Sequence, residues 1–250
     1  WNQNSATYVA WNWKAGGSAS SNTDGSITSS VSANQTAGFS IVSYTGTGSA
    51  LTCGHGLGAV PQWIIVKDRD AAANWNTYHI ANGNAKTSQL NLTNAPSATS
   101  SWNSTTPTSS VFSLGAVSAV NTSGNDYIAY CFAEKKGYSS ITSYAGNASS
   151  NGRYVHLGFE PAFVIIKDIT STDPWHMIDN KRSPRNLMNA RLFPNNSNAE
   201  NTSADICDFV SNGIKFRGTN DGFNGNRNYL IYAVAKAPFV NSKGVPNNAR

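Results

Sequence analysis

Charged residues are scarce in this sequence. Lys, Arg, Asp and Glu make up 12% of the 250 residues, about half of the usual share of roughly 25%. Asn, Ser, Thr and Gly must therefore supply most of the polar surface, which suits an extracellular or particle surface. The formal net charge is +5, and the basic residues form one local cluster, at residues 181–185 (KRSPR). For this cluster a solvated loop is favoured over an anion-binding site. We expect no nucleic-acid partner.

Long apolar runs are also missing. No run reaches the ~18 to 20 residues needed to cross a bilayer, so we expect no membrane insertion. The chain shows no signal peptide and begins at Trp1 rather than Met. We therefore expect a processed product or a piece of a longer protein.

Cysteine is rare and occurs in an odd number. Cys53, Cys131 and Cys207 are the three copies, and no CxxC or Cys/His ligand spacing includes them. A disulfide framework would be expected to recur with the internal repeat described below, and these positions do not recur. We expect buried small hydrophobic side chains rather than bridges or nucleophiles.

Spacings typical of catalytic or metal sites are absent. The four histidines show no ligand spacing, so a structural role is favoured over metal binding. Asp68 and Asp168 each follow a lysine at the end of a predicted strand. A local structural role or turn cap is favoured there over the paired acids of a glycoside hydrolase. Neither a Gly-x-Ser-x-Gly motif nor a phosphate-binding glycine loop occurs. The sequence predicts no enzyme activity, no catalytic residue, no metal and no cofactor.

One stretch of the sequence occurs twice. Residues 57–68 (LGAVPQWIIVKD) return as residues 157–168 (LGFEPAFVIIKD). Each copy is a Gly/Pro turn followed by a β-branched and aromatic run, which is typical of a strand buried on both faces. Flanking residues repeat in the same register, and residues 126–133 (DYIAYCFA) match 228–235 (NYLIYAVA). Two tandem copies of a module of about 100 residues follow from this spacing.

The predicted fold class is all-β, with two tandem antiparallel β-sandwich modules of the jelly-roll or lectin-like kind and an extra N-terminal strand. Residues 1–15 are predicted to be the orphan closing strand of a preceding module, and residues 16–37 a Ser/Thr/Gly-rich linker. The two sandwich repeats are predicted at residues 38–136 and 137–238, and residues 239–250 form a tail.

Aromatic residues are abundant for such a polar chain. Seven tryptophans and ten tyrosines are present, and rings exposed beside Asn and Ser can stack on the CH faces of sugars. Candidate ligand-binding residues are Trp75, Trp102, Trp175 and Tyr78. Packing inside the β cores is the alternative for each of them.

The N-terminal segment is a third copy of the module's closing strand. Residues 7–14 (TYVAWNWK) align with residues 126–133, although the body of that third module is absent. A lone aromatic strand leaves ladder groups unpaired. We expect Tyr8, Trp11 and Trp13 to form an assembly strand, paired within this chain or in a neighbouring one.

Several strings resemble a repeat family of marine bacteriophage structural proteins, found in cyanophages and pelagiphages. They are residues 8–17 (YVAWNWKAGG), 21–27 (SNTDGSI), 33–42 (ANQTAGFSIV), 54–58 (GHGLG) and 130–134 (YCFAE). The resemblance covers nearly the whole chain and implies a tail-fibre, adhesin or capsid-associated protein. It supplies no catalytic residues.

The sequence and the resemblance leave three functional hypotheses. The first is a virion surface structural protein, in a tail fibre or a capsid (head) fibre, that binds host-surface glycan or supports the part that does. The second is a purely structural filament subunit assembled by strand donation. A polysaccharide-degrading enzyme is the least favoured. The first two imply self-association and contacts with other virion proteins.

Overall fold

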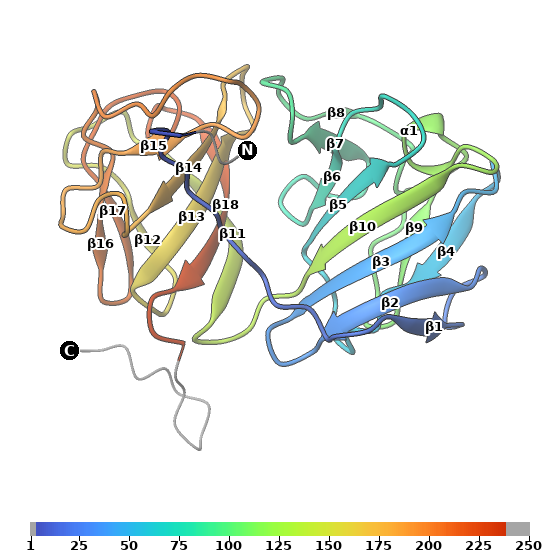
Figure 1. Cartoon of the computed structure of the whole chain (residues 1–250). Coiled ribbons are helices and arrows are strands. Elements are labelled where there is room, and N and C mark those ends of the chain that lie inside the picture. The colour runs from blue at the N-terminus through green and yellow to red at the C-terminus, as the bar shows by residue number, and fades with distance from the viewer. Residues whose placement is uncertain (1–3, 239–250) are drawn as a thin grey trace.

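The protein is all-β and is built from several antiparallel sheets (Figure 1). The computed structural model describes residues 4–238. Within this range the only helix is the single turn α1 (Ser118–Asn121), so no helix in the described part is long enough to span a membrane. The all-β class predicted from the sequence is confirmed.

The first half of the chain forms an eight-stranded sheet in the order β1-β2-β3-β10-β5-β6-β7-β8 and a separate pair, β4-β9. Its strands are β1 (Ser20–Asn22), β2 (Ser29–Asn34), β3 (Phe39–Thr45), β4 (Leu51–Gly54), β5 (Trp63–Asp68), β6 (Asn76–His79), β7 (Lys86–Gln89), β8 (Ser97–Ala98), β9 (Val111–Leu114) and β10 (Asp126–Phe132).

The second half forms a five-stranded sheet in the order β11-β18-β13-β14-β15 and a three-stranded sheet in the order β12-β17-β16. Its strands are β11 (Ser139–Ala145), β12 (Tyr154–His156), β13 (Pro161–Asp168), β14 (Trp175–Asp179), β15 (Arg191–Leu192), β16 (Cys207–Val210), β17 (Gly213–Phe216) and β18 (Asn228–Ala235). Ser211 and Asn212 form the tight turn that joins β16 to β17.

The internal repeat extends to strand order. The run β3-β10-β5-β6-β7 in the first half has the same order as β11-β18-β13-β14-β15 in the second. Equivalent rings also pack alike: Tyr44 stacks on Tyr127 with centroids 5.2 Å apart, and Tyr144 stacks on Tyr229 at 5.0 Å. The duplication in the sequence therefore corresponds to a duplicated local architecture.

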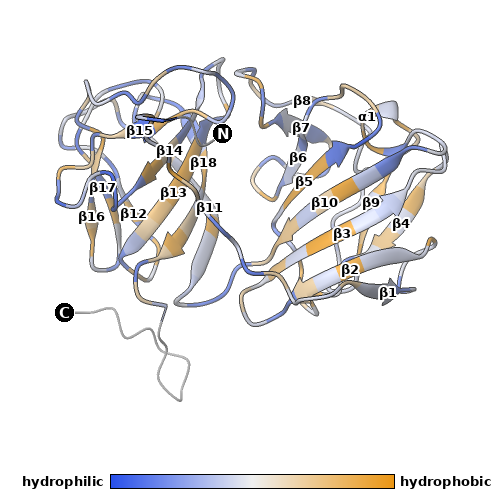
Figure 2. Cartoon of the chain, viewed as in Figure 1, coloured by the Kyte–Doolittle hydropathy of each residue, from blue (hydrophilic) through white to orange (hydrophobic). Residues whose placement is uncertain are grey.

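Each half has its own core on one face of its large sheet. Strand alternation sends Ile64 and Val66 of β5 into the first-half core, and Val164 and Ile166 of β13 into the second-half core. Residues of the small sheets, such as Phe112 of β9, complete these cores. Figure 2 shows the hydrophobic residues gathered on the central strands of both large sheets.

The opposite faces of the two large sheets share a third cluster, here called the central cluster. Its buried members are Phe39, Trp63, Ile65, Phe132, Ile141, Phe163, Ile165, Trp175, Leu230 and Tyr232. Rings from the two halves meet directly, because Trp63 lies 5.3 Å from Tyr232 and 6.3 Å from Trp175 between centroids. The central strands are therefore buried on both faces, as their unbroken apolar runs predict.

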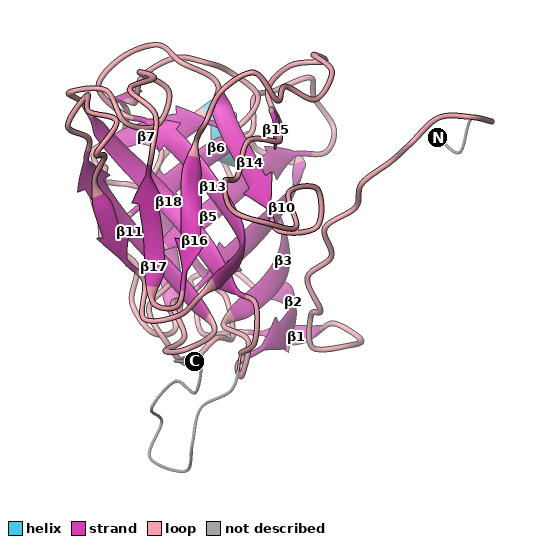
Figure 3. Ribbon diagram, turned by 90° about the vertical axis from the view of Figure 1, so that its left-hand side faces the viewer, coloured by secondary structure: helices cyan, strands magenta, loops and turns pink. Residues whose placement is uncertain are grey.

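The structure differs from two expectations for the N-terminal region, whereas pairing of residues 7–14 with a neighbouring chain stays a prediction. Residues 7–14 form no strand, and the segment runs as a loop outside the sheets (Figure 3). Residues 16–37 are not simply a linker, because they contain β1 and β2, and β2 pairs with β3 along Ser30–Asn34. The physical reason is that β2 alternates serine with Val31 and Ala33, so its average hydrophobicity is low although it lies inside a sheet. The predicted tail, residues 239–250, lies outside the described residues.

Candidate functional site

An aromatic cleft lies where the two large sheets and the N-terminal segment meet. Its volume is about 440 Å³, within the range of roughly 300 to 1,000 Å³ that is usual for ligand pockets. Its aromatic lining consists of Trp11, Trp13, Phe39, Trp63, Trp75, Tyr130, Phe132, Phe163 and Tyr232. We call this cavity the aromatic cleft.

One wall of the cleft belongs to the N-terminal segment. The indole N–H of Trp13 donates to the hydroxyl of Tyr232 at 3.0 Å, and the Trp13 ring meets Phe163 edge-on at 5.7 Å. The Trp11 ring lies 5.6 Å from Phe163, and the Arg182 guanidinium lies over the Trp11 ring, 5.6 Å from its centroid. These contacts hold the segment against the second half.

The same segment is also tied to the first half. Asn34 Nδ2 donates to the carbonyl of Lys14 at 3.1 Å, and Ser32 Oγ donates to the carbonyl of Gly17 at 2.6 Å. Residues 11–17 therefore form a strap that crosses from one half to the other (Figure 1), and Trp11, Asn12 and Trp13 of this strap line the cleft. The assembly residues Trp11 and Trp13 contact their own chain, and Tyr8 is exposed.

The first half contributes a pair of partly exposed rings. Trp75 and Tyr130 lie nearly parallel, with an interplanar angle of 15° and centroids 6.4 Å apart. The backbone N–H of Trp75 donates to Asn91 Oδ1 at 2.9 Å, which fixes the residue just before β6. Tyr130 points to this side because neighbouring Ala129 and Cys131 face the first-half core. Both rings retain solvent-accessible surface in the cleft.

Few polar groups line the cleft. Asn12 is exposed at its rim. The indole N–H of Trp63 is buried and has no hydrogen-bond partner among the described residues. A buried donor left unpaired costs about 1–3 kcal/mol. The accessible lining of the cleft is thus mainly aromatic and apolar.

Three of the four predicted ligand-binding residues are buried. Trp102 is 2% exposed and Tyr78 1% exposed; their rings meet edge-on at 5.8 Å inside the first-half core. Trp175 is 0% exposed, and its indole N–H donates to the Gln89 carbonyl of the other half at 3.0 Å. None of the three presents a ring face to a ligand in this structure. Only Trp75 lies in the cleft.

The equivalent residues Trp75 and Trp175 differ in solvent exposure because the two halves cover each other unequally. The end of β7 and the loop after it lie over Trp175. The carbonyl of Gln89, the last residue of β7, accepts from the Trp175 indole, and the carbonyl of Thr93 in the loop accepts from the backbone N–H of Asp173 at 2.9 Å. The candidate ligand-binding residues predicted from the sequence did not include Trp63, Tyr130, Phe163 or Tyr232. One feature of the sequence could have indicated them: aromatic and apolar residues occupy both faces of these strands, so a second face was available to pack on the other half or to line a cleft.

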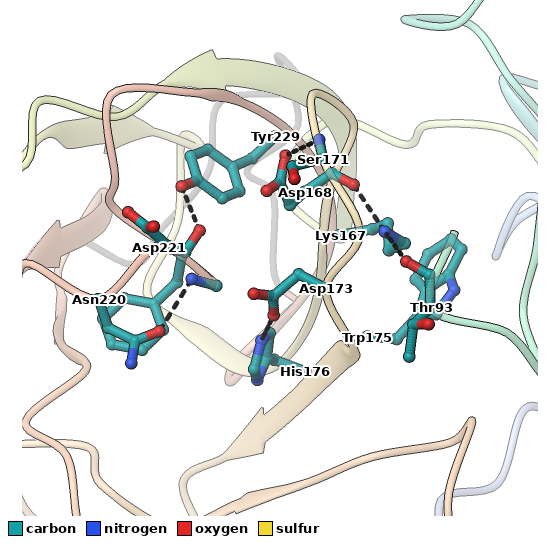
Figure 4. Close-up of polar contacts among 12 residues, drawn as sticks. Thr93, Lys167, Asp168, Ser171, Asp173, Trp175, His176, Asn220, Asp221 and Tyr229 are labelled. Atoms are coloured by element: carbon teal, nitrogen blue, oxygen red, sulfur yellow. Dashed lines mark hydrogen bonds and ion pairs between the residues drawn. The ribbon is translucent and has the colours of Figure 1, made fainter. Parts of the chain in front are cut away.

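A polar cluster beside Trp175 has structural roles (Figure 4). Asp168 Oδ1 accepts from the backbone N–H groups of Thr170 and Ser171, and Asp68 Oδ1 does the same for Asp70 and Ala71. The predicted turn caps are confirmed in both halves.

The other titratable groups are also packed into structure. His176 Nε2 lies 3.0 Å from Asp173 Oδ1, and burial lowers the pKa of this histidine. Cys53, Cys131 and Cys207 are free and buried, as predicted, and burial raises the pKa of Cys53 to about 12. Within residues 4–238, no group of three or more His, Cys, Asp and Glu is placed to hold a metal ion.

Lys167 makes the stability of the protein depend on pH. It is 0% exposed, and its Nζ donates to the carbonyls of Thr93 at 3.1 Å and Asp168 at 2.7 Å. Burial lowers its pKa to about 8, whereas an unfolded lysine titrates at about 10.4. Between these values Lys167 binds more protons in the unfolded chain, so the contribution of this residue to the free energy of unfolding should rise with pH from about 8 to about 10.

The matched measurement is urea denaturation of the wild type and of Lys167→Met over that interval. The free energy of unfolding of the wild type minus that of Lys167→Met should rise over this interval by about 1.4 kcal/mol for each unit of pKa depression. Burial also raises the pKa of Cys53, Cys131 and Cys207 and of Tyr44, Tyr144 and Tyr229, which lowers stability with rising pH in both proteins alike, so the difference between the two profiles is the test. Parallel profiles for the two proteins would show that Lys167 is not the group responsible.

Comparison with known proteins identifies the family of this chain. No curated protein and no solved structure matches it. A family profile described as "Domain of unknown function (DUF7483)" matches residues 1–238, and so covers the strap and both halves together. The chain therefore belongs to the DUF7483 family.

Proposed function

We propose that this protein is a virion surface structural protein, part of a tail fibre or capsid fibre, that binds host-surface glycan in the aromatic cleft. The observation that carries the proposal is the partly exposed pair Trp75 and Tyr130, which shares one cleft with Trp11 and Trp13. Virion location rests on the resemblance to bacteriophage structural proteins, and it is supported by the low charge of the surface.

The cleft has the chemistry that a sugar ring needs. The CH faces of a pyranose pack on aromatic rings, while its hydroxyl groups find polar partners at the rim. Trp75 and Tyr130 supply flat surfaces on the first half, and the Asn12 amide supplies a polar partner. An uncharged lining suits a neutral glycan better than an anionic one.

We further propose that each half is a sandwich of the jelly-roll or lectin-like kind. In the first half the core lies between the large sheet and β4-β9, and in the second between the large sheet and β12-β17-β16. Two such units packed through the central cluster form a rigid support for the cleft. Rigid scaffolds of this type suit fibres that must carry a binding site at a distance from the particle.

Strand donation by residues 7–14 is the second hypothesis, and the contacts of the strap favour it less. Trp11 and Trp13 are engaged by Phe163, Arg182 and Tyr232 of their own chain. A chain truncated to begin at Gly16 separates the two ideas. Under strand donation it should lose self-association, whereas under the proposed function it should lose one wall of the glycan site. A polysaccharide-degrading activity is tested by polymer length after incubation, which we expect to stay unchanged.

Trp75→Ala should weaken glycan binding by about tenfold, equivalent to roughly 1.4 kcal/mol, because it removes one stacking surface. A glycan array selects the ligand, and calorimetry then compares the wild type with the variant. Tyr154→Ala is the matched control, since Tyr154 is 41% exposed on β12 and does not line the cleft. Equal losses in both variants, or none in Trp75→Ala, would refute the cleft as the site.

Virion location has its own test. Gold-labelled antibodies against this protein should decorate fibres on particles seen by electron microscopy. Failure to find the protein on any particle would remove the virion part of the proposal while leaving the glycan part open to the binding assay.

A further inference from the structure

The second half lacks a strand that the first half has. In the eight-stranded sheet, β2 pairs with β3, but β11, the equivalent of β3, is the last strand of its sheet. The cause is visible in the chain: residues 133–138 lead directly from β10 to β11 and are too few to form a further strand. The second half therefore ends in an open edge.

In the first half β2 fills a groove beside the equivalent edge. Its Ser29 Oγ donates to the Gly54 carbonyl at 3.0 Å, and Gln35 Nε2 donates to the Gly56 carbonyl at 2.9 Å. A Cβ added to Gly56 would come within 3.0 Å of Val31 Cγ1 and 3.3 Å of the Ala33 Cβ. The small alternating residues of β2 thus pack closely on residues 54–58.

The corresponding groove in the second half is open. A cavity of about 660 Å³ is lined by residues 139–142 of β11, by residues 156–158, and by Ser211 and Asn212 of the β16–β17 turn, with Glu134, Lys136 and Gly137 at one end. Residues 156–158 occupy the place of residues 56–58 in the repeat, with His156 where Gly56 stands in the first half. The groove is separate from the aromatic cleft, with which it shares no lining residue.

The chain itself already occupies two strand-like positions at one end of this edge: the backbone N–H of Ser139 donates to the Lys135 carbonyl at 2.8 Å in an antiparallel bridge, and the Glu134 side chain occupies the next position. Glu134 Oε2 accepts from the backbone N–H of Ile141 at 2.9 Å and from Ser140 Oγ at 3.3 Å. In the first half the equivalent residue, Ile41, is paired with Ser32 of β2. The Glu134 carboxylate therefore stands where a strand carbonyl would be. The strand β11 itself (SSITSYA) has no proline and no charged residue, although such residues usually prevent an exposed edge strand from pairing with another chain.

We propose that the β11 edge and this groove bind an extended strand from another protein chain. The strand would be uncharged, with small apolar residues at alternate positions, and would lie antiparallel to residues 140–143 of β11 in the register that β2 has on β3, ending before Ser139, which is already bridged to Lys135. Its backbone carbonyl replaces the Glu134 carboxylate at Ile141. Because His156 replaces Gly56, the residue in the position of Val31 must be as small as alanine. This mode of recognition is β-augmentation, and it does not depend on glycan binding.

Disulfide trapping tests the register. The full chain carrying Ser143→Cys, at an exposed position of β11, is mixed with a peptide of residues 28–35 carrying Ser30→Cys and Val31→Ala. Ser30 pairs with Ser43, the equivalent of Ser143. The three native cysteines are buried and do not compete. We expect trapping more than tenfold faster than with a peptide of the same residues in which Val31→Cys is the only change.

Two further readouts complete the test. A peptide of residues 28–35 that carries Val31→Ala and no cysteine should slow hydrogen exchange of the β11 amides of the wild-type chain by at least several-fold. Hydrogen exchange of the β1 amides, at the edge of the other sheet, should not change. Equal trapping of both peptides, or no change in exchange, would overturn the proposal. Rapid disulfide-linked dimerisation of the Ser143→Cys chain without peptide would overturn it too, because the edge would then pair with a second copy of this chain.

Discussion

Trp175→Ala is expected to lower the free energy of unfolding by about 3–5 kcal/mol, the usual cost of truncating a buried Trp or Phe. Trp175 is 0% exposed in the central cluster, and it stacks near Trp63 at 6.3 Å. Its indole N–H donates to the Gln89 carbonyl of the other half. The substitution therefore opens a cavity between the halves and removes a hydrogen bond that joins them.

Chemical denaturation of Trp175→Ala and Trp75→Ala makes a matched comparison, because the two residues are equivalent in the repeat. Trp75 is partly exposed at the cleft, so its loss should cost stability much less while affecting ligand binding. A similar loss of stability in both variants would mean that the two halves do not cover each other unequally as the structure shows.

Asn224→Ala is expected to cost about 2–4 kcal/mol, since a buried group left unpaired costs about 1–3 kcal/mol and this residue serves several. Asn224 is 0% exposed. Its Nδ2 donates to the carbonyls of Ser149 at 2.9 Å and Gly218 at 2.8 Å, and its Oδ1 accepts from the backbone N–H of Asn147 at 3.3 Å. One side chain thus holds three loop segments together.

The duplication supplies the test of this role. Asn121 makes the equivalent bonds in the first half, to the carbonyls of Ser49 and Gly115 and from the N–H of Thr47. Asn121→Ala should therefore cost a comparable amount by thermal or chemical denaturation. Asn198→Ala, at an exposed position, should stay within about 0.5 kcal/mol of the wild type. A small effect at Asn224 would show that water replaces its hydrogen bonds.

The strands of the repeat could be predicted because local pattern determines them. The runs at residues 63–66 and 163–166 are apolar at every position, and both faces of these strands are indeed buried. The second face packs on the other half rather than on its own small sheet. Periodicity shows that a face is buried, but it does not show which surface covers it.

The N-terminal region could not be predicted in the same way. In β2, Ser29 and Ser32 are buried although they are polar, because the Oγ atoms donate to the carbonyls of Gly54 and Gly17. A strand whose buried positions include serine resembles a linker in composition. Residues 7–14 resemble a strand in sequence, yet Trp11 and Trp13 are held by side-chain contacts with the second half rather than by a backbone ladder.

The candidate site was predictable in residue type but not in position. Aromatic stacking residues were expected, and Trp75 lies in the cleft, but Trp102, Trp175 and Tyr78 are buried. Which of two equivalent tryptophans remains accessible depends on how the halves pack. That packing is a long-range property, set by the loop after β7 and by the strap.

Fluorine NMR of protein labelled with 5-fluorotryptophan tests the central claim most directly. Titration with the best glycan from the array should shift the resonances of Trp75, Trp11 and Trp13, assigned by single substitutions to Phe, and leave those of Trp102 and Trp175 in place. Shifts confined to the buried pair, or no shift at saturating glycan, would contradict an aromatic cleft that binds sugar.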